Sequence, residues 1–186
     1  MSTFDYGNAV IVAGVRHENT SFETFGYNDG DIDDVLSFSR DYGFTAPSIN
    51  VKYFLDNNTQ LRASFYRSLS RPGFGETAPI ADISENEGSG QYRGSMGNPD
   101  LEPYEANNID FSYEYYEDGL VLTAGMFYKD IENTIYPRVI AGQTIGGTFF
   151  TELETYANAG SSSILGIELN LFACLLYTSD AADDQL

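Results

Sequence analysis

The sequence QLRASFYRSLS (residues 60–70) runs into SRPGFGETAP (70–79), and GNPDLEPYEANNIDFSYEYY (97–116) follows after a gap. In the first segment Leu61, Ala63 and Phe65 alternate with polar residues, and NNIDFSYEYY alternates in the same way. A period of two indicates β-strands that have one apolar and one polar face. We therefore predict two amphipathic strands, at 60–70 and 105–116, joined by a long connection rich in glycine and proline.

The same alternation predicts four more strands, at 8–18, 48–56, 120–129 and 163–172, with Pro47 introducing the second of these. DNNT (56–59) and EDG (117–119) contain residues typical of tight turns. In contrast, 71–104 and 130–158 are long, and extended pieces are expected near 134–140 and 148–156. GYNDGDIDDV (26–35) has the composition of a loop. No segment shows the spacing of a helix.

Short turns at one end of a sheet and long loops at the other are typical of outer-membrane barrels, whose strands have about 10 residues. We predict an all-β fold, an antiparallel transmembrane β-barrel. About six strands cannot close a barrel, so we expect a fragment of one. The apolar face would meet lipid, because a basic residue at the bilayer midplane costs roughly 2–4 kcal/mol.

The tyrosines of the apolar face bear on the same question. We expect them to form an interfacial aromatic girdle, and the alternative is packing in the core of a soluble β-sandwich. The residues concerned are Tyr53, Tyr113, Tyr115 and Tyr128.

Composition excludes several functions. The 186 residues include 28 acidic and 9 basic ones, a formal net charge of −19, which argues against nucleic-acid binding. Many of the acidic residues lie in candidate loops, where they serve solubility or attract cationic or metal-bearing ligands. The one histidine, His17, and the one cysteine, Cys174, do not make a recognisable zinc site, and no nucleophile elbow occurs. We predict no enzyme activity, no cofactor and no metal site.

Several motifs together resemble one family. YRSLSRPGFGETAP (66–79), GNPDLEPYEANNIDFSYEYY (97–116) and AGMFYKDIENTI (124–135) look like the C-terminal half of a TonB-dependent outer-membrane receptor barrel. AGVRHENT (13–20) is similar to a barrel motif that usually ends in Arg-Tyr-Glu, with His17 in place of the aromatic residue. YANAGSSSILGIELNL (156–171) resembles a later strand of the family.

The resemblance implies a bacterial outer-membrane receptor with a 22-strand barrel and an N-terminal plug. It also implies energised uptake of a scarce nutrient, such as a siderophore, cobalamin or an oligosaccharide, driven by a TonB-type partner that engages the plug. Outer-membrane lipid would surround the barrel. The plug, the TonB box and the final strand are not seen in this sequence, which again indicates a fragment. A passive porin or adhesin barrel and a soluble glycan-binding β-sandwich stay open as alternatives.

We expect ligand contacts from the long loops and from the inner face of the wall. The loop candidates are Arg71, Phe74, Tyr92, Arg93, Tyr104 and Tyr136, and the wall candidates are Arg62, Asp110, Glu114 and Glu168. The barrel domain is expected to cover 1–173. The tail CLLYTSDAADDQL (174–186) has lost the alternation and looks like a translated sequencing adaptor, so we predict that it is not native.

Overall fold

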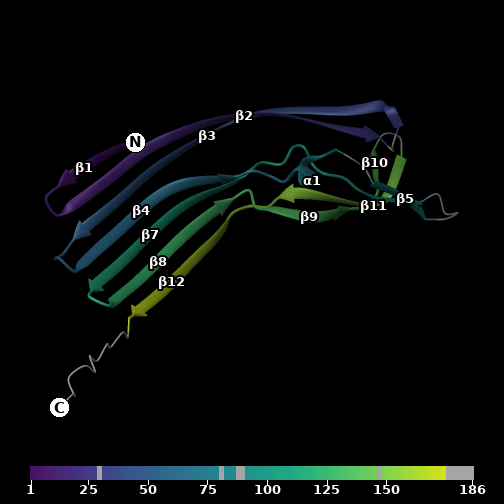
Figure 1. Cartoon of the computed structure of the whole chain (residues 1–186). Coiled ribbons are helices and arrows are strands. Elements are labelled where there is room, and N and C mark those ends of the chain that lie inside the picture. The colour runs from purple at the N-terminus through teal and green to yellow at the C-terminus, as the bar shows by residue number, and fades with distance from the viewer. Residues whose placement is uncertain (29–30, 80–81, 87–90, 146–147, 175–186) are drawn as a thin grey trace, which may run out of the picture.

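The computed structural model describes residues 1–28, 31–79, 82–86, 91–145 and 148–174. It contains two antiparallel-rich sheets that follow one another along a curved, elongated shape (Figure 1). The main sheet has the strand order β1-β2-β3-β4-β7-β8-β12 and is antiparallel throughout. Its strands are β1 (Ser2–Tyr6), β2 (Ala9–Asn28), β3 (Asp31–Phe54), β4 (Thr59–Ser70), β7 (Tyr104–Glu117), β8 (Leu120–Glu132) and β12 (Ser162–Ala173).

The smaller sheet is built from the long connections. Its order is β10-β11-β6-β5, and β9 also pairs with β11. The strands are β5 (Asp82–Asn86), β6 (Gln91–Ser95), β9 (Ile135–Ile140), β10 (Gln143–Ile145) and β11 (Thr148–Asn158). β9 and β11 confirm the extended pieces expected in the second long connection. The β6–β11 pairing is parallel and joins two connections that are far apart in the sequence.

The pairing register places all the predicted apolar faces on one side of the main sheet. Ile49, Phe65, Ile109, Tyr128 and Leu165 are successive direct partners across five strands. Direct partners share a face. Ile109 is 52% exposed, so no described element covers this outward face. An uncovered apolar face of this extent suits contact with lipid.

The tyrosines predicted for a girdle lie on this outward face, toward its two ends. Tyr53 and Tyr113 share one row near the short turns, Tyr115 lies in the next outward row toward these turns, and Tyr128 lies at the opposite end. Tyr53 is 44% exposed, as expected for an interface rather than for a packed sandwich core. Beyond Tyr128 the next outward row is polar and marks the upper edge of the apolar band; it consists of Arg67, Asn107, Asp130 and Ser163.

The hairpin of β2 and β3 is much longer than predicted, since the strands pair almost continuously from Ala9 with Tyr53 to Tyr27 with Val35. The loop expected at 26–35 is therefore wrong except around residues 29–30, which lie outside the described residues. Beyond the membrane both faces of a strand meet water, so alternation is no longer required and the sequence signal fades.

Pro47 does not begin a strand but lies within β3, where it pairs with Val15. It is one residue beyond the last pair of β3 with β4, Ser48 with Tyr66. On that side no ladder remains to be broken by the missing N–H, which is the situation in which a strand tolerates proline.

Two further elements were not predicted from the sequence. β1 precedes the expected first strand and pairs with β2 across Gly7, whose φ is +58°. A single helical turn, α1 (Phe74–Thr77), lies in the SRPGFGETAP segment. The predicted tail is described only at Cys174, whose N–H donates to the carbonyl oxygen of Gly119, so the tail prediction otherwise falls outside the described residues. None of the described helices is long and apolar enough to cross a membrane.

The best-buried side chains lie at the loop end of the molecule. Leu101, Phe150, Leu153 and Pro79 are each at most about 2% exposed. Here the two glycine-rich motifs meet in what we call the rim clasp, residues 76–79 and 97–98. The N–H of Gly97 donates to Ala78 O at 2.9 Å, and the N–H of Asn98 donates to Glu76 O at 2.6 Å. The outer connections are thus packed together rather than free.

Candidate ligand-binding surface

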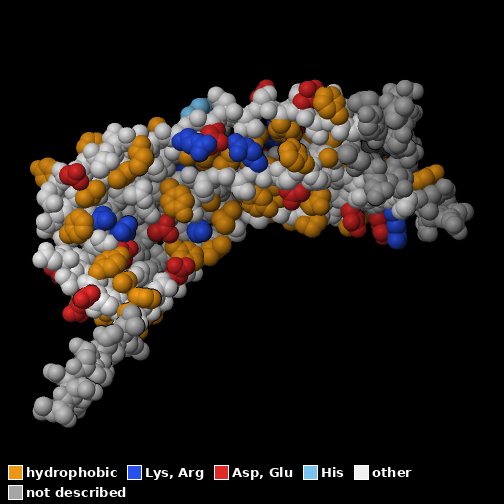
Figure 2. Space-filling view, viewed as in Figure 1, with side chains coloured by type: hydrophobic (Ala, Val, Ile, Leu, Met, Phe, Trp, Pro, Cys, Tyr) orange, Lys and Arg blue, Asp and Glu red, His pale blue; other side chains and the backbone are white. Residues whose placement is uncertain are grey.

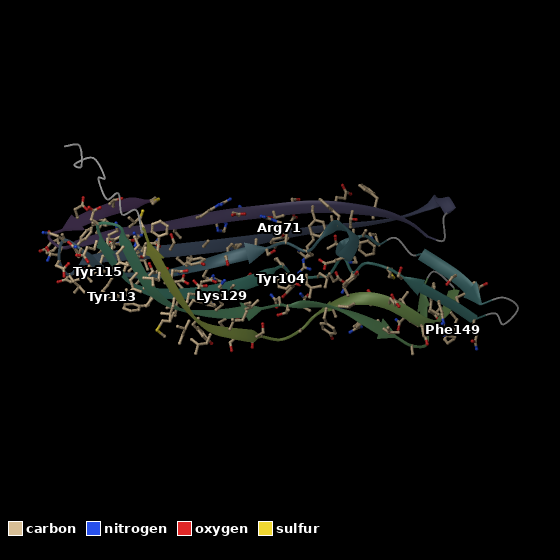
Figure 3. All side chains as sticks on the ribbon, turned by 60° about the horizontal axis from the view of Figure 1, so that its bottom comes forward. Arg71, Tyr104, Tyr113, Tyr115, Lys129 and Phe149 are labelled. Atoms are coloured by element: carbon tan, nitrogen blue, oxygen red, sulfur yellow. The ribbon has the colours of Figure 1, made fainter. Side chains whose placement is uncertain are left out.

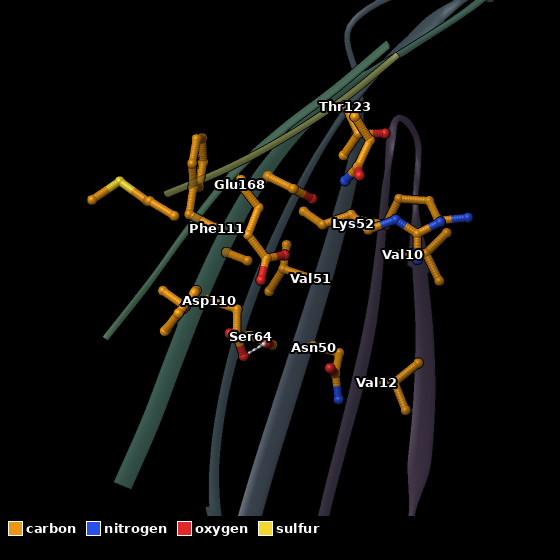
Figure 4. Close-up of a pocket in the computed structure, with 17 residues that line it drawn as sticks. Val10, Val12, Asn50, Val51, Lys52, Ser64, Asp110, Phe111, Thr123 and Glu168 are labelled. Carbon is orange, nitrogen blue, oxygen red and sulfur yellow. Dashed lines mark hydrogen bonds between the residues drawn. The ribbon is translucent and has the colours of Figure 1, made fainter. Parts of the chain in front are cut away.

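The polar face of the main sheet is hollowed over its centre. A cavity of about 480 Å³, the wall hollow, lies there between side chains of β2, β3, β4, β7, β8 and β12 (Figure 4). Lys52, Arg62, Ser112, Gly125 and Glu168 are successive direct partners and cross it as one row. Charged side chains of both signs mix with hydrophobic ones on the face shown in Figure 2. The inner wall is therefore polar over the same strands whose outer face is apolar.

Two of the predicted wall residues are bound to each other. Arg62 Nε lies 3.0 Å from a carboxylate oxygen of Glu114, which is largely buried. Glu114 also accepts hydrogen bonds from the amide of Gln60 and from the hydroxyls of Ser112 and Tyr116, at 3.1 and 2.7 Å for the hydroxyls. With four donors around it, Glu114 stabilises the wall and its carboxylate has little capacity left for a ligand.

The other two wall candidates are more accessible. Asp110 accepts a hydrogen bond from Ser64 Oγ at 3.0 Å, drawn as a dashed line in Figure 4. Glu168 lies exposed on the edge strand β12, in the same row as Arg62. Arg62, Asp110 and Glu168 all line the wall hollow, whereas Glu114 is one row closer to the turns.

Aromatic side chains that sequence reasoning did not select also line the inner face. The ring of Phe127 lies over Gly166, its direct partner, so closely that a Cβ there would be 2.2 Å from the ring. Lys129 Nζ is 5.6 Å from the centroid of the same ring, and Lys52 Nζ is 5.3 Å from that of Phe54. The signal was present in the sequence as Gly166 within an otherwise strong strand.

The loop candidates fall into two groups rather than one site. Figure 3 shows Arg71 and Tyr104 beside the main sheet, near Lys129, with Phe149 far away in the small sheet. Tyr104 Oη donates to Ile135 O at 3.3 Å. Phe74 on α1 is 95% exposed. The remaining candidates lie in the small sheet: Tyr92, Arg93, which pairs with Glu152 at 3.2 Å, and Tyr136.

Arg71 belongs to a second cavity, the rim hollow, of about 400 Å³. It is lined by residues that include Arg16, Glu18, Phe44, Tyr66, Arg67 and Arg71, and it lies above the apolar band. Glu18 accepts from Arg71 Nη2 at 2.8 Å and from Arg16 Nε at 2.8 Å. The hydrogen bond from Arg71 lowers the pKa of the Glu18 carboxyl, and that of Arg71 is raised in turn. Arg16 and Arg67 were not among the predicted contacts.

In the described residues, no group of three or more His, Cys, Asp or Glu side chains is placed to hold a metal ion. The cavities instead combine guanidinium, ammonium, carboxylate and aromatic groups. Such surfaces bind and orient ligands through hydrogen bonds, charge and stacking.

A curved antiparallel sheet with a bare apolar outer face, a charged inner face, short turns at one end and packed loops at the other defines a segment of an outer-membrane β-barrel wall. The sequence matches the family described as TonB dependent receptor-like, beta-barrel, over residues 1–185. The chain therefore belongs to this family, whose members are outer-membrane proteins and serve as transport receptors, not as enzymes. A comparison with curated proteins finds no match.

Solved structures show the same fold. The hemophore receptor HasR of Serratia marcescens, solved as a double mutant with its hemophore HasA and heme, is 18% identical with a TM-score of 0.62, covering 91% of this chain and 30% of that one. The siderophore receptor PirA of Pseudomonas aeruginosa is 20% identical, with a TM-score of 0.59 and coverage of 90% and 32%. The ferric enterobactin receptor PfeA of the same organism, as a mutant, is also 20% identical, with a TM-score of 0.55 and coverage of 88% and 24%. The chain thus spans about a quarter to a third of these receptors.

Proposed function

We propose that this chain forms part of a receptor that binds a scarce nutrient at the cell surface and takes it up across the outer membrane with energy from a TonB-type partner. The observation that carries the proposal is the two-sided sheet. Its outward face suits lipid, while its inward face and rim carry hollows lined by charged and aromatic side chains. The family assignment favours this function over a passive porin, an adhesin or a soluble glycan-binding sandwich.

In this proposal the loops and the wall contact the ligand one after the other. Arg71 and Tyr104 at the upper end of the main sheet meet the ligand first, and Asp110 and Glu168 in the wall hollow contact it further inside. Arg62 and Glu114 hold the wall in shape through their mutual ion pair. Phe74, Tyr92, Arg93 and Tyr136 would contribute from the outer surface. The structures of siderophore and hemophore receptors with similar folds support a nutrient of this general kind.

Energy dependence tests the proposal. In cells that produce the intact outer-membrane protein, uptake of its nutrient should stop when the TonB-type partner is deleted, while binding at the cell surface persists. A passive barrel would instead show uptake that is indifferent to the partner and proportional to the external concentration. Loss of surface binding together with uptake would indicate that the deletion reduces the amount of receptor, which immunodetection of the barrel measures directly.

A further inference from the structure

We propose that the rim hollow is a subsite for the anionic groups, carboxylate or phosphate, of the transported ligand. The proposal rests on the receptor function above and names the chemical class of its ligand. The residues that carry it are Arg16, Arg67 and Arg71, which line a single cavity of about 400 Å³. Arg67 belongs to the outward row of β4 and reaches the cavity beyond the last β3–β4 pair, where its Nη1 donates to Thr45 O at 3.5 Å.

The charge of this cavity is opposite to that of the chain. The protein has a formal net charge of −19 and only 9 basic residues, yet three of these nine line the rim hollow. One carboxylate, that of Glu18, lies among them and is shared by Arg16 and Arg71. Because one negative charge faces two guanidinium groups, a positive charge stays uncompensated. Figure 2 shows basic side chains gathered around an acidic one on this face.

The guanidinium groups are held in place by acceptors of the protein itself, and Arg71 donates through Nη2 to Glu18 at 2.8 Å and to Thr20 at 3.0 Å. Arg16 binds Glu18 through Nε, and its side chain is 76% exposed, so the group stays accessible to a ligand. Arg67 is oriented by Glu105 at 2.6 Å and by the ring of Phe44, whose centroid is 5.3 Å away. Guanidinium groups with fixed planes are the donors best matched to carboxylate and phosphate, since they bind both oxygens at once.

The position of the rim hollow fits a first contact for a ligand that arrives from outside. It lies above the apolar band and shares Ser68 and Leu69 with a neighbouring cavity of about 330 Å³. That neighbour adds the ammonium of Lys129 and the hydroxyl group of Tyr104. An anion seated at Arg16 and Arg71 would therefore have a further cationic group beside it, at the same level of the wall.

The test uses the intact outer-membrane protein in detergent at low salt, with citrate and inorganic pyrophosphate as anionic probes and maltotriose as a neutral one. We expect saturable binding of the anions, measured by calorimetry, and about tenfold weaker binding in each of Arg16→Gln and Arg71→Gln. Arg138→Gln is the matched control, because it removes the same charge from the exposed strand β9 outside the hollow. Raising the salt concentration should weaken anion binding in the unaltered protein.

Three outcomes would overturn the proposal: no saturable anion binding, equal loss in Arg138→Gln, or unchanged affinity in both hollow variants. If another segment of the same protein already fills the hollow, no saturable anion binding will be seen. Circular dichroism of each variant shows whether the barrel is folded. The anion-binding test can fail while uptake still depends on the TonB-type partner. In that case the receptor function stands and only the anionic ligand class is wrong.

Discussion

Gly97 lies against Ala78 with its N–H 2.9 Å from the Ala78 carbonyl oxygen, and a Cβ added to Gly97 would come within 2.4 Å of that oxygen. The two residues belong to GNPDLEPY and SRPGFGETAP, two of the motifs on which the resemblance to the family rests. Gly97 therefore serves the close packing of two backbone segments, which a side chain at this position would disturb.

We expect Gly97→Ala to open the rim clasp. The substitution pushes two backbone segments apart and weakens the bonds to Ala78 and Glu76, which should cost about 1–3 kcal/mol locally. Limited trypsin digestion should then cut faster at Arg93, in the connection between the two motifs. Gly75→Ala is the control, because a Cβ there has no atom within 4 Å. Equal digestion of the two variants would contradict the role of the clasp.

Gly166 and Phe127 form a second matched pair. Gly166→Ala should displace the Phe127 ring and cost about 1–2 kcal/mol in the free energy of unfolding. When Phe127→Ala is already present, Gly166→Ala should cost much less, because the clashing ring is gone. Guanidinium titration of the four proteins measures the coupling. Gly125→Ala, whose Cβ would meet only ordinary contacts at 3.7 Å, should be near neutral; a cost equal to that of Gly166→Ala would refute the explanation.

Glu114 and Glu168 share the inner face but should differ in their contribution to stability. Glu114→Ala deprives Arg62, Gln60 and Tyr116 of their acceptor and should cost about 2 kcal/mol. Glu168→Ala removes an exposed side chain and should change stability by less than about 0.5 kcal/mol. Chemical unfolding in detergent compares them, and a larger loss for Glu168→Ala would be incompatible with the network described.

Asp56 should make the turn between β3 and β4 sensitive to acid. Its pKa is lowered chiefly by the N–H of Asn58, with further hydrogen bonds from Thr59. A carboxyl whose pKa is lower in the folded state stabilises above its unfolded pKa of about 3.9, and this contribution is lost as pH falls through the folded value. Asp56→Asn keeps the capping geometry without titrating.

The unaltered protein should therefore lose more stability than Asp56→Asn between about pH 4.5 and pH 2.5. Thermal unfolding across this range measures the difference. Asp56→Ala, which lacks the cap altogether, should be less stable than both at neutral pH. Parallel pH profiles for the unaltered protein and Asp56→Asn would show that the turn carboxylate does not contribute.

The wall candidates could be chosen from sequence because alternation assigns each strand residue to a face. Arg62, Asp110, Glu114 and Glu168 all lie on the inner face as predicted. Alternation does not say which of them accept hydrogen bonds from neighbouring side chains, so the hydrogen bonds to Glu114 could not be predicted. The rim hollow was invisible for a different reason: Arg16 and Arg71 lie 55 positions apart along the chain and meet only through Glu18.

The sequence by itself determined the class of the protein. A period of two needs no tertiary information, since successive side chains of any strand point to opposite sides, and tight Asn and Gly turns set the hairpins. The tertiary structure alone decided how the loops pack and which charges share a cavity. Those features depend on contacts such as Gly97 with Ala78, whose residues are brought together by the order and register of strands that lie between them.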